Sequence, residues 1–245
     1  CFATSGPGAT NILTGIATAQ ADSSPMIAVT GQVPVAMIGK DAFQESDIIG
    51  MANPVVKYAF QPRTPGEVPE MVKKGFYIAE TGRPGPVLID VPKDVQQNES
   101  PMEFPEEFKI QGYHPWYDPD MIACEKAIEM LLNSEKPIIL AGGGTIISSA
   151  FAELQSIAET LMIPVVTTFK GKGAFPENHP LSLGPIGMHG HAEANKMMAE
   201  ADCVLAIGTR FSDRSVGTFE AFEKRLKIIH MDVDPAEIGK NQTTS

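Results

Sequence analysis

The sequence predicts an α/β protein with parallel sheets. Short apolar runs recur before Gly or Pro without the polar alternation of a half-exposed strand, and amphipathic segments of helical length separate them. Strands that are apolar on both faces indicate parallel sheets covered by helices on each side. The 245 residues, 43% of them hydrophobic, suffice for two modest cores. We therefore expect two α/β domains.

The individual elements follow from composition and spacing. Residues 1–4 have the composition of the end of a buried strand, and further strands are expected at 26–30, 86–91, 138–141, 164–167, 204–207 and 228–232. Apolar residues at helical spacing predict helices over 12–21, 65–81, 122–132 and 151–161. The expected apolar face of the second helix consists of Val68, Met71, Val72, Gly75, Phe76 and Ala79.

A change of composition divides the chain. From about residue 94 to residue 118, Gln, Asn, Glu, Pro and aromatic residues replace the apolar runs, and the prolines there oppose regular structure. We expect a linker over 95–118, between a first domain, 1–94, and a second domain, 119–245. Its aromatic content indicates that the linker packs on the protein surface, unlike a Gly/Ser tether.

Charge and cysteine usage exclude several classes of protein. Nineteen Lys and Arg against 30 Asp and Glu give 19 − 30 = −11, which repels nucleic acid and acidic membranes. The three cysteines form no C-x-x-C pair, so neither a disulfide framework nor a zinc site is expected. No apolar run approaches the roughly 20 residues of a membrane span. We expect a cytoplasmic protein, if the source is prokaryotic.

Two polar loops follow the first two expected strands. Residues 4–11 (TSGPGATN) combine Ser and Gly at a strand-to-helix turn, where backbone N–H groups can face a ligand. An ordinary turn with Thr10 or Asn11 as the helix cap is an equal alternative. In the second loop, 30–45, Gln44 can act as an amide donor beside a carbonyl and Phe43 can exclude water. Solvated loop residues are the simpler alternative there.

Two cations flank the strand expected at 86–91. Arg83 precedes this strand and Lys93 follows it, so the two lie at opposite ends. Arg83 either stabilises the end of a helix or contacts a ligand. Because ligands bind at the carboxyl ends of parallel strands, Lys93 is the stronger candidate of the two for contact with a ligand.

The second domain contains further candidates for ligand binding. Residues 142–144 are consecutive glycines between a strand and a helix, which permits close approach of the backbone to a nucleotide. Asp232 closes the last strand and either accepts from a ribose hydroxyl or lies in a solvated turn. His189 and His191 have no third ligand at a suitable spacing, so we expect no metal site.

The order of the motifs is more specific than any one of them. The chain carries, in this sequence, SGPGATN, TGQVP, GKDAFQE, TGRPGPVLIDVPKDV, AGGG, GMHG, GTRFSDR and HMDVDPAEIGKN. In that order they resemble the catalytic subunits of acetolactate synthases, which depend on thiamine diphosphate. The resemblance implies that 1–94 is the later part of the pyrimidine-binding domain. It also implies that 119–245 is a Rossmann-like central FAD-binding domain, incomplete at its end.

The resemblance assigns roles to individual residues. Gln44 would lie beside the thiamine reaction centre, with Phe43 and Lys93 near the substrate channel. Arg214 would face the substrate entrance. The residues that would surround FAD are Arg83, Gly142, Gly143, Gly144, Gly187, Met188, His189, Gly208, Thr209, Arg210, Asp232 and Val233.

The resemblance also implies a reaction. Pyruvate and a second 2-keto acid, either pyruvate or 2-ketobutyrate, would condense with release of CO2 in branched-chain amino-acid biosynthesis. The implied cofactors are thiamine diphosphate, Mg2+ and a structural FAD, and the implied partners are further copies of the chain, as a dimer or tetramer, and a regulatory small subunit. Alternatives are another thiamine-dependent enzyme, of the pyruvate oxidase or glyoxylate carboligase type, and a non-catalytic nucleotide-binding module.

Two features of the resembling family would lie outside these residues. Its essential Glu would precede Cys1, and its GDG motif for magnesium and the diphosphate would follow Ser245. We therefore expect this chain to be an internal fragment and, by itself, inactive.

Overall fold

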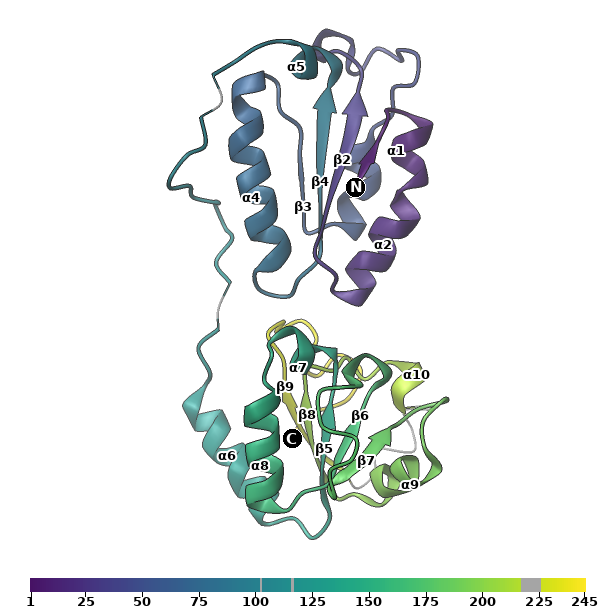
Figure 1. Ribbon diagram of the computed structural model, residues 1–245, viewed down its shortest axis with the longest axis vertical. Coiled ribbons are helices and arrows are strands. Elements are labelled where there is room, and N and C mark those ends of the chain that lie inside the picture. Colours follow the sequence, from purple (N-terminus) through teal and green to yellow (C-terminus); the bar gives the residue numbers. More distant parts are fainter. Residues whose placement is uncertain (102, 116, 217–225) are drawn as a thin grey trace. The chain divides into compact units, whose positions relative to one another are not determined.

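The computed structural model describes residues 1–101, 103–115, 117–216 and 226–245. They form two compact units, Cys1–Trp116 and Tyr117–Ser245, named here the first and the second unit (Figure 1). Each unit contains one sheet, and all strand pairs of the described residues are parallel. The predicted α/β class with parallel sheets is thereby confirmed.

The sheet of the first unit has the order β1-β2-β4-β3. Its strands are β1 (Phe2–Ala3), β2 (Met26–Gln32), β3 (Tyr58–Phe60) and β4 (Pro86–Pro92). All seven residues of β4 are buried, since the strand has a neighbour on each side and helices on both faces. Thr30 of β2 is the register partner of Asp90 in β4. Two polar side chains therefore sit together inside an apolar sheet.

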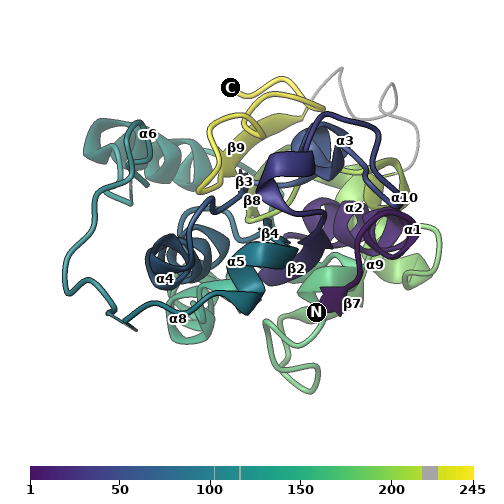
Figure 2. The ribbon, with the colours of Figure 1, turned by 90° about the horizontal axis from the view of Figure 1, so that it is seen from above.

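Helices cover both faces of this sheet. Their bounds are α1 (Pro7–Asn11), α2 (Leu13–Asp22), α3 (Ile48–Ala52), α4 (Val68–Glu80) and α5 (Lys93–Gln97), with 3-10 turns at Val35–Met37, Asn53–Val55 and Pro65–Glu67. Val87 and Ile89 pack on the side of α4, whereas Leu88 packs on the side of α1, α2 and α3. Figures 1 and 2 show α4 and the pair α1 and α2 on opposite sides of β2 and β4.

The second unit has a five-stranded sheet of order β7-β6-β5-β8-β9. Its strands are β5 (Pro137–Ala141), β6 (Val165–Thr167), β7 (Ser182–Pro185), β8 (Cys203–Ile207) and β9 (Lys227–Met231). The chain runs outward from β5 through β6 to β7 and then returns to the other side of β5 with β8. The strand order thus reverses between β5 and β8, where open α/β sheets bind ligands beyond their carboxyl ends.

Helices also cover both faces of the second sheet. They are α6 (Met121–Leu132), α7 (Gly143–Ile147), α8 (Phe151–Leu161), α9 (Ala192–Glu200) and α10 (Asp213–Val216), with a 3-10 turn at Phe169–Gly171. Ile139 and Ala141 pack with residues of α6 and α8, and Ile138 and Leu140 pack with α9. None of the helices in the described ranges is long and apolar enough to cross a membrane.

Most predicted elements are observed near their expected bounds. The six internal strands and the helices expected at 12–21, 122–132 and 151–161 are confirmed within a few residues. The helix expected at 65–81 begins at Val68, because the three preceding residues form a 3-10 turn. β3 and β7 were not predicted, since runs of three and four residues carry too little periodicity.

Three local predictions were wrong. Phe2 is 85% exposed because β1 is an edge strand with one neighbour, β2. Phe76 is 52% exposed, whereas the other five residues of the predicted face of α4 are buried or pack against the core together with Ile78. The alternative in which Thr10 or Asn11 caps the helix expected at 12–21 is not observed, because both residues belong to α1 and Ile12 is the residue before α2.

The segment after α5 packs on the first unit. Residues 95–97 of the predicted linker are helical. Ile110 and Tyr113 contact the apolar cluster on the α4 side of the sheet. The Tyr113 hydroxyl donates to the Thr81 carbonyl at 2.8 Å and lies 3.1 Å from Lys57 Nζ, which donates to it. The aromatic side chain thus fastens this segment to the end of α4.

Candidate functional site

Loops gather at the carboxyl edge of the first sheet. The loop after β1 contains Gly6, whose φ of 60° lies in the left-handed region. A Cβ added to Gly6 would lie 2.7 Å from the carbonyl oxygen of Gln44, in the loop after β2. The SGPGATN and GKDAFQE motifs are therefore in backbone contact, and only glycine fits the junction.

Phe43 and Gln44 are presented to solvent at this edge. The Phe43 side chain is 90% exposed, and Gln44 is also exposed, with a φ of 61°. Lys93 is exposed as well and is the first residue of α5, directly after β4. The first unit thus places an aromatic ring, an amide and a cation along one sheet edge, where a ligand can be oriented and shielded from water.

Carboxylates hold the loop that carries Phe43 and Gln44. Glu45 accepts hydrogen bonds from the backbone N–H groups of Gly39 and Ala42, the latter at 2.9 Å. These bonds, the one from Gly39 foremost, lower the pKa of the Glu45 carboxyl below its ordinary value. At the start of the loop, the Val35 N–H donates to Asp94 Oδ1 at 3.1 Å. The loop is closed on itself and fastened to α5.

A buried carboxylate, Asp90, lies beneath the same edge. It accepts from Thr30 Oγ1 at 2.7 Å, from Gln32 Nε2 at 3.0 Å and from Gln61 Nε2 at 2.8 Å. Burial raises the pKa of Asp90 above its ordinary value, although the three side-chain hydrogen bonds act in the opposite direction. Gln32 Nε2 also donates to the Ser46 carbonyl at 2.9 Å. Asp90 is thus linked to the loop by one shared amide.

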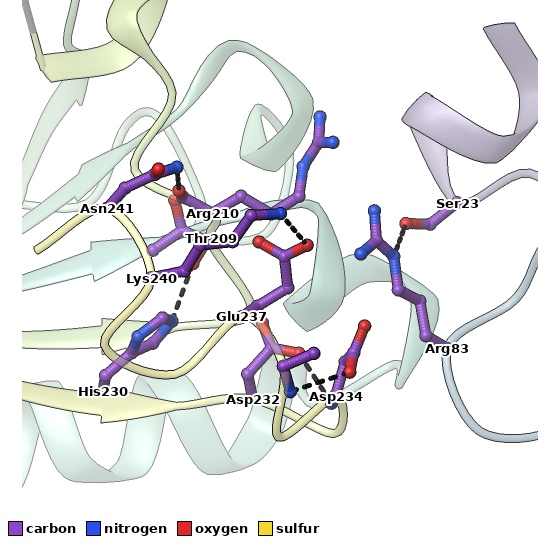
Figure 3. A network of polar contacts seen from close by, with 11 residues as sticks. Ser23, Arg83, Thr209, Arg210, His230, Asp232, Asp234, Glu237, Lys240 and Asn241 are labelled. Atoms are coloured by element: carbon purple, nitrogen blue, oxygen red, sulfur yellow. Dashed lines mark hydrogen bonds and ion pairs between the residues drawn. The ribbon is translucent and has the colours of Figure 1, made fainter. Parts of the chain in front are cut away.

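Arg83 lies away from these groups, at the amino end of β4. Its Nε donates to Ser23 Oγ at 2.8 Å, at the end of α2 (Figure 3). Lys93 is at the opposite end of the same strand. The structure therefore separates Arg83 from Gln44 and Lys93 within the first unit, as their positions around one strand predict.

In the second unit, two glycine loops meet at the switch point between β5 and β8. The Gly144 N–H donates to the Gly208 carbonyl at 3.0 Å, and a Cβ added to Gly144 would lie 2.6 Å from Gly208 Cα. A Cβ on Gly142 would also collide with the backbone of Gly208 and Thr209. Packing between loops is thus sufficient to require glycine at 142 and 144, whatever else binds there.

Thr209 and Arg210 continue the loop after β8. His230 Nε2 lies 2.8 Å from the Thr209 carbonyl, and Asn241 Nδ2 donates to the Arg210 carbonyl at 2.8 Å (Figure 3). Thr209 is buried, whereas Arg210 is partly exposed. The loop is therefore fixed through two of its backbone carbonyls.

Asp232 and Val233 follow β9 at the same edge of the second sheet. Asp232 Oδ1 accepts from the Asp234 N–H at 2.9 Å, which shapes the turn drawn in Figure 3. The Val233 side chain is 43% exposed. A turn therefore follows this strand, and the Asp232 carboxylate accepts a hydrogen bond from the backbone of Asp234 within it.

The GMHG motif lies against Arg214. Gly187 has a φ of 100°, and the Met188 N–H donates to the Arg214 carbonyl at 3.2 Å. Arg214 Nη1 lies 4.0 Å from Met188 Sδ. His189 is exposed, and the described part of the chain contains no group of three His, Cys, Asp or Glu side chains suited to a metal ion.

Comparison with known proteins decides the family. Residues 1–51 match "Thiamine pyrophosphate enzyme, N-terminal TPP binding domain", and residues 124–245 match "Thiamine pyrophosphate enzyme, central domain". This chain belongs to the thiamine pyrophosphate enzyme family. The first match covers both loops that meet at Gly6 and Gln44, and the second covers the switch point between β5 and β8.

Individual relatives within this family are acetolactate synthases. The chain is 54% identical over 244 residues to the probable acetolactate synthase large subunit of Methanocaldococcus jannaschii, covering 98% of the chain and 41% of that protein. It is 48% identical over 250 residues to the acetolactate synthase of Arthrospira platensis, covering 100% and 43%. It is 47% identical over 240 residues to the acetolactate synthase large subunit of Corynebacterium glutamicum, covering 98% and 38%. The predicted relationship is confirmed, and the chain spans about two fifths of these relatives.

Two residues near the carboxyl ends of the strands, one in each unit, were not among the candidates taken from the sequence. Asp90 was overlooked although an acidic residue inside the run PVLIDVP is itself a signal, since a buried carboxylate needs partners. Lys170 lies in the 3-10 turn after β6, with its Cβ 3.2 Å from a Cβ added to Gly143. Its place in the loop after the strand expected at 164–167 is the signal that marks it as a candidate.

Proposed function

We propose that the protein carrying this chain is an acetolactate synthase, which condenses pyruvate with pyruvate or 2-ketobutyrate and releases CO2. The observation that carries the proposal is the contact between Gly6 and Gln44, which joins two motifs at one sheet edge of the matched thiamine-binding domain. The similarity to acetolactate synthases across nearly the whole chain supports the same reaction.

In this proposal, the residues at the edge orient the reactants. Thiamine diphosphate, when bound, supplies the electron sink for decarboxylation and carbon–carbon bond formation. The Gln44 amide donates to a carbonyl of a reactant, Phe43 excludes water, and Lys93 attracts the keto-acid carboxylate. The exposure of this amide, ring and cation in segments that follow the strands of one sheet supports such a role. We assign no magnesium ligand within the described residues.

The reaction is tested with the complete protein, thiamine diphosphate, Mg2+ and FAD. We expect acetolactate from pyruvate alone and acetohydroxybutyrate when 2-ketobutyrate is added. Lys93→Ala should raise KM for pyruvate roughly tenfold, the effect of losing one charge-assisted contact, whereas Lys136→Ala should leave KM unchanged. Lys136 is a suitable control because it is exposed and precedes β5 at the amino edge of the other sheet. Acetyl phosphate or a glyoxylate-derived product would favour the neighbouring reaction types instead.

We further propose that the second unit binds FAD as a structural cofactor. The donor set at the switch point suits a dinucleotide: backbone N–H groups near Gly143, cations at Arg210 and Lys170 for the diphosphate, and Asp232 for a ribose hydroxyl. Equilibrium dialysis against FAD and NAD tests this assignment. We expect FAD to be retained, and a preference for NAD would favour a nucleotide-binding module of another kind.

The relatives' names suggest an assembly. Since the Methanocaldococcus jannaschii and Corynebacterium glutamicum proteins are called large subunits, we propose a cytoplasmic complex of several copies with a regulatory small subunit. Sedimentation of the purified complete protein, with and without a co-expressed small subunit, measures both associations.

A further inference from the structure

The loop that carries Phe43 and Gln44 is anchored to the sheet by a buried polar cluster. Asp90 lies in β4 and is 0% exposed. It accepts one hydrogen bond from Gln32, at the end of the neighbouring strand β2, and one from Gln61, just after the other neighbouring strand, β3. Both donors are primary amides at similar distances. They differ in one respect: Gln32 Nε2 also reaches the Ser46 carbonyl in the loop, at 2.9 Å.

The geometry of Gln32 makes it a bridge between sheet and loop. Its Oε1 accepts from the Val33 N–H at 2.9 Å, so one amide binds both ends of the segment between β2 and α3. The Gln32 side chain is 5% exposed, and an amide held by a buried carboxylate cannot rotate without leaving a buried polar group unpaired. Asp90 thus orients Gln32, and Gln32 fixes Val33 and Ser46.

Glu45 completes the arrangement from within the loop. Its two carboxylate oxygens accept from Gly39 and Ala42, which draws the preceding turn together. Between these bonds and the Ser46 anchor lie Phe43 and Gln44, the latter with a positive φ. A non-glycine residue holds such a backbone conformation only where its surroundings enforce it. The Glu45 carboxylate and the Gln32 amide restrain the backbone on either side of Gln44.

We propose that Gln32, oriented by Asp90, and Glu45 are positioning residues that hold Phe43 and Gln44 in the geometry required by the reaction proposed above. This inference rests on that proposed function for its catalytic meaning. The order of the loop is a property of the chain itself and is measured independently of any activity.

The test compares two glutamines that bind the same carboxylate. Gln32→Met and Gln61→Met each remove one donor to Asp90, but only Gln32→Met releases the loop. Amide hydrogen exchange of residues 39–46 should accelerate about tenfold in Gln32→Met, the effect of one lost hydrogen bond, and remain at the wild-type rate in Gln61→Met. Thermal unfolding of both variants checks that each is folded.

A second pair of variants tests the hydrogen bonds that Glu45 accepts within the loop. Neither carboxylate of this pair is fully buried. Glu45→Gln weakens one acceptor to the loop backbone, and Asp202→Asn makes the matched change at a carboxylate that accepts from Glu135 and Lys136 N–H groups at the amino edge of the second sheet. Only Glu45→Gln should accelerate exchange at Gly39 and Ala42. It should also lower kcat for acetolactate formation about tenfold with KM nearly unchanged. A misplaced Gln44 or Phe43 weakens stabilisation of the transition state more than binding of the substrate.

The outcomes separate this inference from the proposed function. Faster loop exchange together with a lower kcat in Gln32→Met and Glu45→Gln, but not in their controls, supports the positioning role. An active wild-type protein whose kcat is unaffected by these two changes, or whose loop exchange is the same in Gln32→Met and Gln61→Met, overturns the positioning role alone. A wild-type protein that forms no acetolactate overturns the proposed function, whatever the exchange rates show.

Discussion

Gly6 is the residue on which the first-unit edge depends most directly. Its φ of 60° is unfavourable for any L side chain, and a Cβ there would meet the Gln44 backbone. Gly112 has a similar φ of 74°, but no atom in the described part of the chain lies within 4 Å of a Cβ added to it. A side chain at Gly112 would therefore introduce backbone strain alone, whereas one at Gly6 would introduce backbone strain and a steric collision.

Gly6→Ala should destabilise the protein by more than Gly112→Ala, which is expected to cost about 1 kcal/mol from backbone strain alone. The collision at Gly6 also moves Gln44, so acetolactate formation should fall strongly in Gly6→Ala and stay at the wild-type level in Gly112→Ala. Urea unfolding and steady-state kinetics provide both measurements. Equal kinetic effects of the two changes would contradict the predicted displacement of Gln44.

Asp90 should make stability depend on pH in an unusual direction for a carboxylate. Because burial raises its pKa in the folded state, the folded protein binds the proton more tightly than the unfolded chain. The contribution of Asp90 to stability is therefore greatest below its ordinary pKa of 3.8 and declines as pH rises through the folded-state pKa. The free energy of unfolding of the wild type, minus that of Asp90→Asn, should decrease from acid to neutral pH in urea titrations. An increase would show that the three hydrogen bonds outweigh burial.

At the scale of elements, β4 is the strand that contributes to both apolar clusters of the first unit. It pairs with β2 and β3, and alternate side chains enter the two apolar clusters. Its run PVLIDVP was recognisable as a strand because six of its seven residues are apolar, Asp90 being the exception. Which face each residue serves was decided by register and by the helices on either side, as the exposed Phe76 of α4 also shows.

Leu88→Ala should lower the free energy of unfolding of the first unit by about 2 to 5 kcal/mol, because it removes a fully buried side chain from the centre of the sheet. Gly15→Ala, in α2, should instead raise stability by about 0.5 to 1 kcal/mol, since none of the described atoms lies within 4 Å of the added Cβ and helices favour Ala over Gly. Urea unfolding of both variants measures the contrast. A small loss in Leu88→Ala would mean that β4 is less tightly packed than its burial indicates.

At the scale of the whole molecule, the two units should hold different cofactors. Gly144→Ala places a Cβ 2.6 Å from Gly208 Cα and should force apart the loops at the switch point. We expect loss of bound FAD, followed by flavin absorbance, while thiamine diphosphate affinity of the complete protein is retained. Gly173→Ala is the control, because its φ of 93° is also positive but the added Cβ has no described neighbour within 4 Å. Parallel loss of both cofactors in Gly144→Ala would contradict the division of roles.

The sequence alone determined the α/β class, most strands and long helices, and the family. Composition and periodicity report burial, and the order of the motifs is specific to the family even where each motif is weak. Only the tertiary structure decided that Gly6 touches Gln44 and that Gly142 and Gly144 pack on the loop of Gly208. It also decided that Gln32 joins Asp90 to Ser46, at the end of the loop that carries Phe43 and Gln44. Such contacts join residues far apart in the chain, and they follow from strand order and register, which local sequence patterns do not encode.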